Sequence, residues 1–509
     1  MNRVSLFKNF LFFVTAFLYL FFVSFDFFIG DLSHLTLNSA FNIFKDYGYT
    51  YGNMSNATSA VKNSPLTSIF LSFVFQILDN FIILEPINII RSSSFVIVLF
   101  TTISLIFFYD TVKTLSSSKI SIVITFFFFS NHYILNTLLK ISSEALGFLL
   151  IVILFNQLNK FYLTDKYFHF VIAVIANTFL YSARYQLLFI HLYGIILIIY
   201  ICKKKNYRYW PVVLPVFGIV VNFYINWLQS NNVFGHPSGV NGDQFSTLVN
   251  DFIVLVKRLF LIPNLPLTKY VFLIIIFTVL YSIFRHKMLK NITFKSIFIP
   301  NFSFEYLAFF TFGNVVLLFL TLRMNKVDSL SFRYFIYNLF FIFLLISIIC
   351  LKNKTLLVYL SFLAIFNIST IYSNSLVNEK LNNCYCSDLS LETITYINNN
   401  LLEENFIGSR FASQIYYSNY RGSVFLLPFY SEYNASYEKV LSLTEGNFIK
   451  LVTEENINHI IFFEGKDKND SFIENKLYGD FIEKLYYGNS IYVEEIIELS
   501  DGKVIKLRY

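Results

Sequence analysis

The stretch GDLSHLTLNSAFNIFKDYGYTYG, Gly30 to Gly52, separates the first apolar run of the chain from the second. It places an acid, Asp31, where a hydrophobic segment meets water. Leu37, Phe41 and Phe44 follow at i, i+4 and i+7, a spacing that predicts a short helix lying on a membrane surface. The fold therefore depends on which side of a membrane this stretch occupies and on how the chain crosses afterwards.

The composition predicts many membrane spans. Hydrophobic residues make up 56% of the 509 residues, only 14% are charged, and the mean hydropathy is +0.58. An ordinary soluble domain does not sustain such values. The net charge of +7 comes mostly from short basic clusters between apolar runs, which are topology signals before they are binding patches. We expect membrane lipids as partners and no nucleic acid.

Charge bias decides the topology. Arg3 and Lys8 precede an uncleaved apolar run, which predicts a cytoplasmic N-terminus and an outer loop over 29–65. The block from 66 to 110 can be read as one span or two. One crossing, with an interfacial helix over 66–84, puts every later basic loop in the cytoplasm. Those loops are 113–119, 160–166, 203–208, 285–295 and 352–354.

With one crossing between residues 66 and 110, the sequence predicts about eleven spans. Several are somewhat shorter than the ~20 residues that a helix needs to cross a bilayer. The spans are expected at 9–28, 92–109, 120–138, 145–158, 167–182, 187–202, 210–228, 270–284, 304–322, 334–350 and 355–371. The predicted membrane domain covers 1–372 and has a long outer loop at 229–269. The fold class is then a polytopic α-helical membrane protein with a small C-terminal domain on the extracytoplasmic side.

From residue 373 to 509 the composition becomes polar and alternating, and no further spanning run follows. Helix-like patterns at 392–404 and 437–455 alternate with strand-like runs, which predicts a small α/β domain. The strand-like runs are 424–427, 457–463, 492–499 and 504–509.

The outer side collects the unusual charges. No nucleotide, metal or nucleophile motif is present, whereas Asp31, Glu144, Arg184 and Arg333 all fall at the outer ends of spans. Each could be an interface anchor when considered alone. Together they supply an acid that can act as a base and cations that can hold an anion.

The order of these features resembles the GT-C class of glycosyltransferases, which use polyprenyl-phosphate sugars, with the protein-mannosyltransferase and aminoarabinose-transferase branches as kin. The matching features are Asp31, Ala40 and Tyr47-Gly48-Tyr49, then Ser64-Pro65-Leu66, Ile141 to Leu146, Ser182 to Tyr185, Asn232 to Pro237, and Phe332-Arg333-Tyr334. Many relatives carry Asp-Glu where this chain has Asp31-Leu32, so the participation of a divalent cation stays open.

The resemblance implies an inverting hexosyl or pentosyl transfer to a glycan, lipid or protein acceptor. Asp31 would be the general base, and Glu144, the second catalytic candidate, would orient the acceptor or a cation. Arg184, Arg333 and Lys269 would bind the donor phosphate. Tyr49, His236 and Asp243 are acceptor or loop candidates. No metal ligand and no further cofactor are assigned.

Three other functions compete with this interpretation. A lipid or glycolipid transporter would favour charges at mid-span and repeated halves, which the chain lacks. An O-antigen ligase or polymerase also takes lipid-linked sugar but lacks the early acidic loop. A sensor would not need so many spans.

Overall fold

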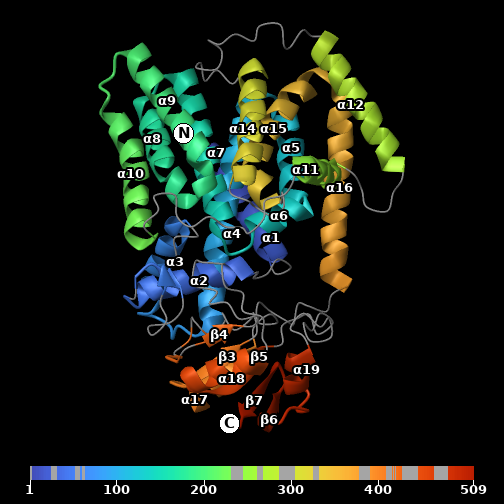
Figure 1. Ribbon diagram of the computed structural model, residues 1–509. Coiled ribbons are helices and arrows are strands. Elements are labelled where there is room, and N and C mark those ends of the chain that lie inside the picture. Colours follow the sequence, from blue (N-terminus) through green and yellow to red (C-terminus); the bar gives the residue numbers. More distant parts are fainter. Residues whose placement is uncertain are drawn as a thin grey trace. The chain divides into compact units, whose positions relative to one another are not determined.

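Long apolar helices make up most of the chain, and a five-stranded sheet forms near its C-terminus (Figure 1). The computed structural model describes residues 3–24, 31–46, 48–51, 58–59, 64–230, 245–260, 267–285, 304–324, 332–377, 390–408, 415, 418, 420–422, 424–426, 445–463 and 480–508. The chain divides into two compact units. The first comprises Met1–Phe27 and Phe95–Glu379, and the second comprises Phe28–Ser94 and Lys380–Tyr509. The domain boundary near residue 373 stays a prediction.

The first unit is a helix bundle. Its helices are α1 (Arg3–Ser24), α4 (Pro86–Leu115, which begins in the second unit), α5 (Ser118–Ser130), α6 (His132–Leu138), α7 (Ser143–Thr164), α8 (Tyr167–Ala183), α9 (Leu188–Lys205), α10 (Trp210–Ser230), α11 (Phe245–Phe260), α12 (Leu267–Arg285), α14 (Phe304–Met324), α15 (Phe332–Lys352) and α16 (Lys354–Val377). A short 3-10 turn, η1 (Tyr185–Leu187), joins α8 to α9. Each predicted span coincides with a helix, or with the pair α5 and α6.

Five helices among the described residues are long and apolar enough to cross a membrane, and a sixth span results if α5 and α6 are one. Several other helices are apolar, but the parts of them that the structure describes are only 10–17 residues long. The protein is a multi-pass membrane protein, and the count of eleven stays a prediction. Buried Phe side chains fill the bundle core, with Phe128 stacked on Phe108 and Phe148.

The single span predicted at 120–138 is wrong in one respect, because the helix breaks at Asn131. The axes of α5 and α6 differ by 71°. The Asn131 side chain accepts hydrogen bonds from the backbone N–H groups of Tyr133 and Ile134 and so starts α6 as its N-cap. The run of four Phe residues before it hid this local signal.

A helix that the sequence did not predict lies inside the long loop. α11 buries Leu255 and Leu259, and Phe252 packs edge-on against Phe335 of α15. Arg258 lies over the ring of Tyr133. Figure 1 shows α11 nearly end-on, so its axis runs across those of α15 and α16.

The second unit contains the stretch that follows the first apolar run. Helix α2 (Asp31–Phe44) confirms the predicted short helix and packs on α3 (Pro65–Leu78), where Ser68 Oγ donates to the Thr36 carbonyl. Strands β1 (Thr50–Tyr51) and β2 (Thr58–Ser59) pair antiparallel. With 14 residues, α3 rises about 21 Å, which is short of a hydrocarbon core of about 30 Å. Its length therefore agrees with one crossing between 66 and 110, made by α4.

The same unit holds a mixed sheet in the order β4-β3-β5-β7-β6. Its elements are β3 (Asn405–Gly408), β4 (Val424–Leu426), β5 (Ile457–Phe463), β6 (Val493–Leu499) and β7 (Gly502–Leu507), with α17 (Leu391–Asn400), α18 (Glu445–Glu454) and α19 (Asp480–Tyr486). β4, β3 and β5 run parallel, whereas β7 is antiparallel to both β5 and β6. This mixed sheet with its helices confirms that the C-terminal part is α/β, as predicted.

Neighbouring residues of β5 point to opposite faces of this sheet, as a strand requires. Ile461 and Phe463 pack with α17, and Ile460 and Phe462 pack with α18 and α19. Tyr49 packs against the α17 face. Tyr49 therefore connects the segment between the first two apolar runs to the core of the C-terminal sheet.

Candidate functional site

Three residues that the sequence placed on one side of the bundle meet in the first unit. Arg184 Nη2 lies 2.9 Å from Glu144 Oε1, and Arg333 Nε lies 2.6 Å from the same oxygen. The Glu144 and Arg184 side chains are 2% and 8% exposed, whereas that of Arg333 is 29% exposed. The cluster is closed on the Glu144 side and reaches solvent through Arg333.

The local backbone explains this convergence. Glu144 lies in the first turn of α7 and Arg333 in the first turn of α15, so both helices start at the cluster. Arg184 follows the last residue of α8 in an extended conformation, which turns its side chain back toward α7. Its Nη1 donates to Ser143 Oγ at 2.7 Å, and its Nε donates to Gln186 Oε1 at 3.4 Å.

Gly147 allows the close approach of α7 and α15 one turn further in. A Cβ at this position would lie 2.9 Å from the Tyr337 hydroxyl and 3.2 Å from Leu187. Residues four apart share a face of a helix, so Arg333 and Tyr337 both face α7. A glycine three residues after Glu144 therefore keeps the phenol next to the charged cluster.

The charges in the cluster do not balance. Within the described ranges, Arg184 and Arg333 share this one carboxylate, so two cations face one anion. Arg184 Nη2 and Arg333 Nε lie within ion-pair distance of Glu144, but neither N–H points along a hydrogen bond to a described residue. Buried charges require both pairing and hydrogen bonds, and guanidinium groups bind phosphate or carboxylate in a fork geometry. The arrangement can accept one further anionic group.

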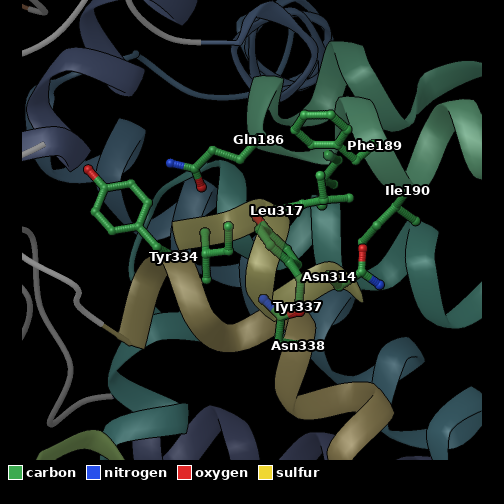
Figure 2. Close-up of a pocket in the computed structure, with 10 residues that line it drawn as sticks. Gln186, Phe189, Ile190, Asn314, Leu317, Tyr334, Tyr337 and Asn338 are labelled. Atoms are coloured by element: carbon green, nitrogen blue, oxygen red, sulfur yellow. The ribbon is translucent and has the colours of Figure 1, made fainter. Parts of the chain in front are cut away.

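A small pocket lies beside the cluster (Figure 2). Its volume is about 30 Å³, room for roughly one or two water molecules. Gln186 and Asn314 line it from η1 and α14, and α15 contributes Tyr334, Tyr337 and Asn338. The Tyr337 hydroxyl and the Asn338 amide oxygen are buried and make no hydrogen bond among the described residues. A pocket of this size admits a single hydroxyl group of a sugar, which amide and phenol groups of this kind can bind.

The remaining predicted residues lie elsewhere or outside the description. Asp31 is the first residue of α2 in the second unit, and Lys269 lies in the first turn of α12; the side chains of both are outside the described residues. Tyr49 packs on the C-terminal core. His236 and Asp243 fall in 231–244, which is also outside the described residues. In the described part of the chain, no three His, Cys, Asp or Glu side chains gather as metal ligands.

Sequence reasoning missed the polar residues of the pocket. Tyr337 and Asn338 lie within an apolar span, where buried polar side chains are rare and often functional. The spacing of Tyr337, four residues after Arg333, was the signal that could have identified it.

Comparison with protein families gives no match, and no curated protein matches the chain. Among solved structures the chain is similar to the archaeal oligosaccharyltransferase AglB from Archaeoglobus fulgidus, in complex with an inhibitory peptide and a dolichol-phosphate. The sequence identity is 11% and the TM-score is 0.37, over 90% of this chain and 70% of that one.

Proposed function

We propose that the chain is a membrane glycosyltransferase that takes a sugar from a polyprenyl-phosphate donor and transfers it with inversion to an acceptor. The observation that carries this proposal is the sharing of Glu144 Oε1 by two arginines. The surplus positive charge suits a phosphate monoester or diester. The exposure of Arg333 gives that phosphate a route to the cluster, and the neighbouring amide and phenol groups suit the sugar.

In this mechanism Asp31 is the general base. It takes the proton from the acceptor hydroxyl while that oxygen attacks the anomeric carbon, and the bond from this carbon to the phosphate oxygen breaks. The polyprenyl phosphate leaves with the electron pair, and Arg184 and Arg333 stabilise the charge that develops on it. Lys269 is a third candidate for the phosphate, and Glu144 holds the two guanidinium groups in place.

The remaining assignments belong to the same proposal. Tyr49, His236 and Asp243 are candidates for acceptor contacts. The charge bias of the basic loops favours a cytoplasmic N-terminus, and the site and the C-terminal sheet are then extracytoplasmic. The GT-C class is proposed from the order of the sequence motifs.

The first test measures binding of a polyprenyl phosphate to the full chain in lipid nanodiscs. We expect Arg333→Gln to weaken binding by about 10- to 100-fold, because one charge-assisted contact is worth roughly 1.5–3 kcal/mol. Arg258→Gln is the matched control, since Arg258 lies over the ring of Tyr133, whereas Arg184 and Arg333 are the cations paired with Glu144 in the described part of the chain. Equal affinity of Arg333→Gln and the wild type would refute the phosphate assignment.

The second test separates binding from transfer. Asp31→Asn should bind polyprenyl phosphate as the wild type does but lose transfer of labelled sugar from a panel of polyprenyl-phosphate donors. A general base contributes on the order of a hundred- to ten-thousand-fold to the rate. Undiminished transfer by this variant would exclude Asp31 as the base, whereas the phosphate assignment would still rest on the Arg333 result.

A further inference from the structure

A second charged pocket lies at the opposite end of α7 from Glu144, between α7 and α9. Its volume is about 250 Å³, and its lining includes Tyr162, Asp165, Tyr200, Lys204 and Lys205. Since α7 has 22 residues, its two ends are about 30 Å apart, which is the thickness of a hydrocarbon core. The pocket and the Glu144 cluster therefore lie at opposite membrane interfaces.

The pocket carries surplus positive charge. Lys205 Nζ pairs with Asp165 Oδ2 at 2.7 Å, and both side chains are partly exposed. Lys204 Nζ lies 5.7 Å from the centre of the Tyr162 ring, and among the described residues it has no carboxylate within ion-pair distance. Lys203 and Arg208 are exposed nearby in the sequence. One carboxylate thus faces two lysines inside the pocket.

The ends of the two helices form the walls. Asp165 after α7 and Asn206 after α9 both adopt the left-handed conformation, with φ of 57° and 55°. Short polar side chains tolerate this conformation better than other residues do. The ion pair between Lys205 and Asp165 places these two helix ends side by side at the pocket.

An apolar stripe leads to the pocket along α9. Leu192 and Ile196 are exposed and continue in steps of four residues to Tyr200 and Lys204, and residues four apart are neighbours on a helix. Tyr209 and Trp210 are exposed just beyond Arg208, as aromatic residues at membrane interfaces commonly are. The apolar stripe can hold one acyl chain of a lipid, and the lysines at its end can hold the negatively charged headgroup.

We propose that this pocket binds an anionic glycerophospholipid, with the phosphodiester on Lys204 and Lys205 and an acyl chain along the α9 stripe. Basic pockets between transmembrane helices bind anionic headgroups through the same attraction. The proposal does not depend on glycosyl transfer. Binding here anchors α7 from the end opposite Glu144.

Native mass spectrometry of the full chain, titrated with phosphatidylglycerol and with phosphatidylcholine of identical acyl chains, tests the proposal. We expect preferential retention of phosphatidylglycerol. Lys204→Gln should weaken it roughly fivefold and the Lys204→Gln/Lys205→Gln double variant roughly 25-fold, since each basic residue contributes about 1 kcal/mol. Lys354→Gln, an exposed lysine at the start of α16, is the matched control.

Asp165→Asn distinguishes this proposal from a general loss of structure. Asparagine tolerates the left-handed conformation and removes the negative charge, so phosphatidylglycerol should bind about fivefold more tightly. Loss of folding cannot give this result. Equal retention of the two lipids, unchanged affinity in the double variant, or no gain with Asp165→Asn would overturn the proposal. Displacement of the lipid by an equal concentration of inorganic phosphate would also overturn it, because the pocket would then bind the free anion.

Discussion

Replacing Glu144 by Gln removes the only negative charge that two arginines share in the described structure, while the shape of the side chain is kept. Removing one partner of a buried ion pair costs about 3–5 kcal/mol, because the other charge is left uncompensated. Arg333 is 29% exposed and can turn toward water, so Arg184 bears most of this cost. We expect the free energy of unfolding to fall by about 3 kcal/mol.

The same substitution should strengthen the binding of an anion. With Glu144 neutral, a polyprenyl phosphate becomes the counterion of both guanidinium groups. The ligand should therefore stabilise Glu144→Gln more than it stabilises the wild type. Loss of stability together with a gain in phosphate affinity is the signature of a charge effect.

Unfolding can be followed by helical circular dichroism in mixed micelles with an increasing fraction of dodecyl sulfate, with and without polyprenyl phosphate. Asp110→Asn is the control, because Asp110 pairs with Lys160 where both side chains are about one-third exposed and an ion pair is worth about 1 kcal/mol at most, and the asparagine oxygen can still accept the hydrogen bond from Asn156. Adding Arg333→Gln to Glu144→Gln should recover part of the loss, since it removes repulsion between the arginines. Equal costs for the two acid-to-amide changes would refute the reasoning.

Three further predictions concern other parts of the chain. Gly218→Ala should destabilise the bundle by about 1–3 kcal/mol in the same micelle assay, because a Cβ there would clash with the backbone carbonyl of Thr178 in α8. Gly313→Ala is the control, since a Cβ there has no neighbour within 4 Å among the described residues. Burial lowers the pKa of His459 below 6.5 despite its contact with Glu404, so the unfolded chain takes up the proton more readily; the protection factors of the β5 amides, which correct for the intrinsic pH dependence of exchange, should therefore fall as the pH falls from 8 to 5, and much less so in His459→Gln. Tyr337→Phe should leave stability unchanged, because the hydroxyl makes no hydrogen bond among the described residues, but should raise the KM for a sugar donor and leave the affinity for polyprenyl phosphate unchanged.

The side of the bundle on which charges gather follows from the sequence, whereas their exact pairing does not. Counting crossings placed Glu144, Arg184 and Arg333 at one end, and the three meet there. That both arginines approach one oxygen depends on the rotation of α7 and α15 about their axes. The Gly147 contact fixes that rotation through tertiary packing, which hydropathy does not record.

Three local elements could not be predicted because the surrounding sequence is strongly apolar or strongly polar. Asn131 caps a helix in the middle of a predicted span. α11 is amphipathic but lies within a predicted loop. In the C-terminal sheet, β3 is only four residues long, too short for its alternation to stand out, although it pairs between β4 and β5.

The break at Asn131 has a consequence for how the protein is made. The short helix α6 has only seven residues and cannot span a bilayer alone, and its partners besides α5 and α7 include α15, which is synthesised about 200 residues later. The backbone groups released at the break find partners in the part of the chain that is made early, because Asn131 caps the start of α6 and Thr101 of α4 donates to the Leu138 carbonyl. The packing of α6 against α15 is therefore completed late in membrane insertion. Chains truncated before α15 should remain with the insertion machinery or be degraded.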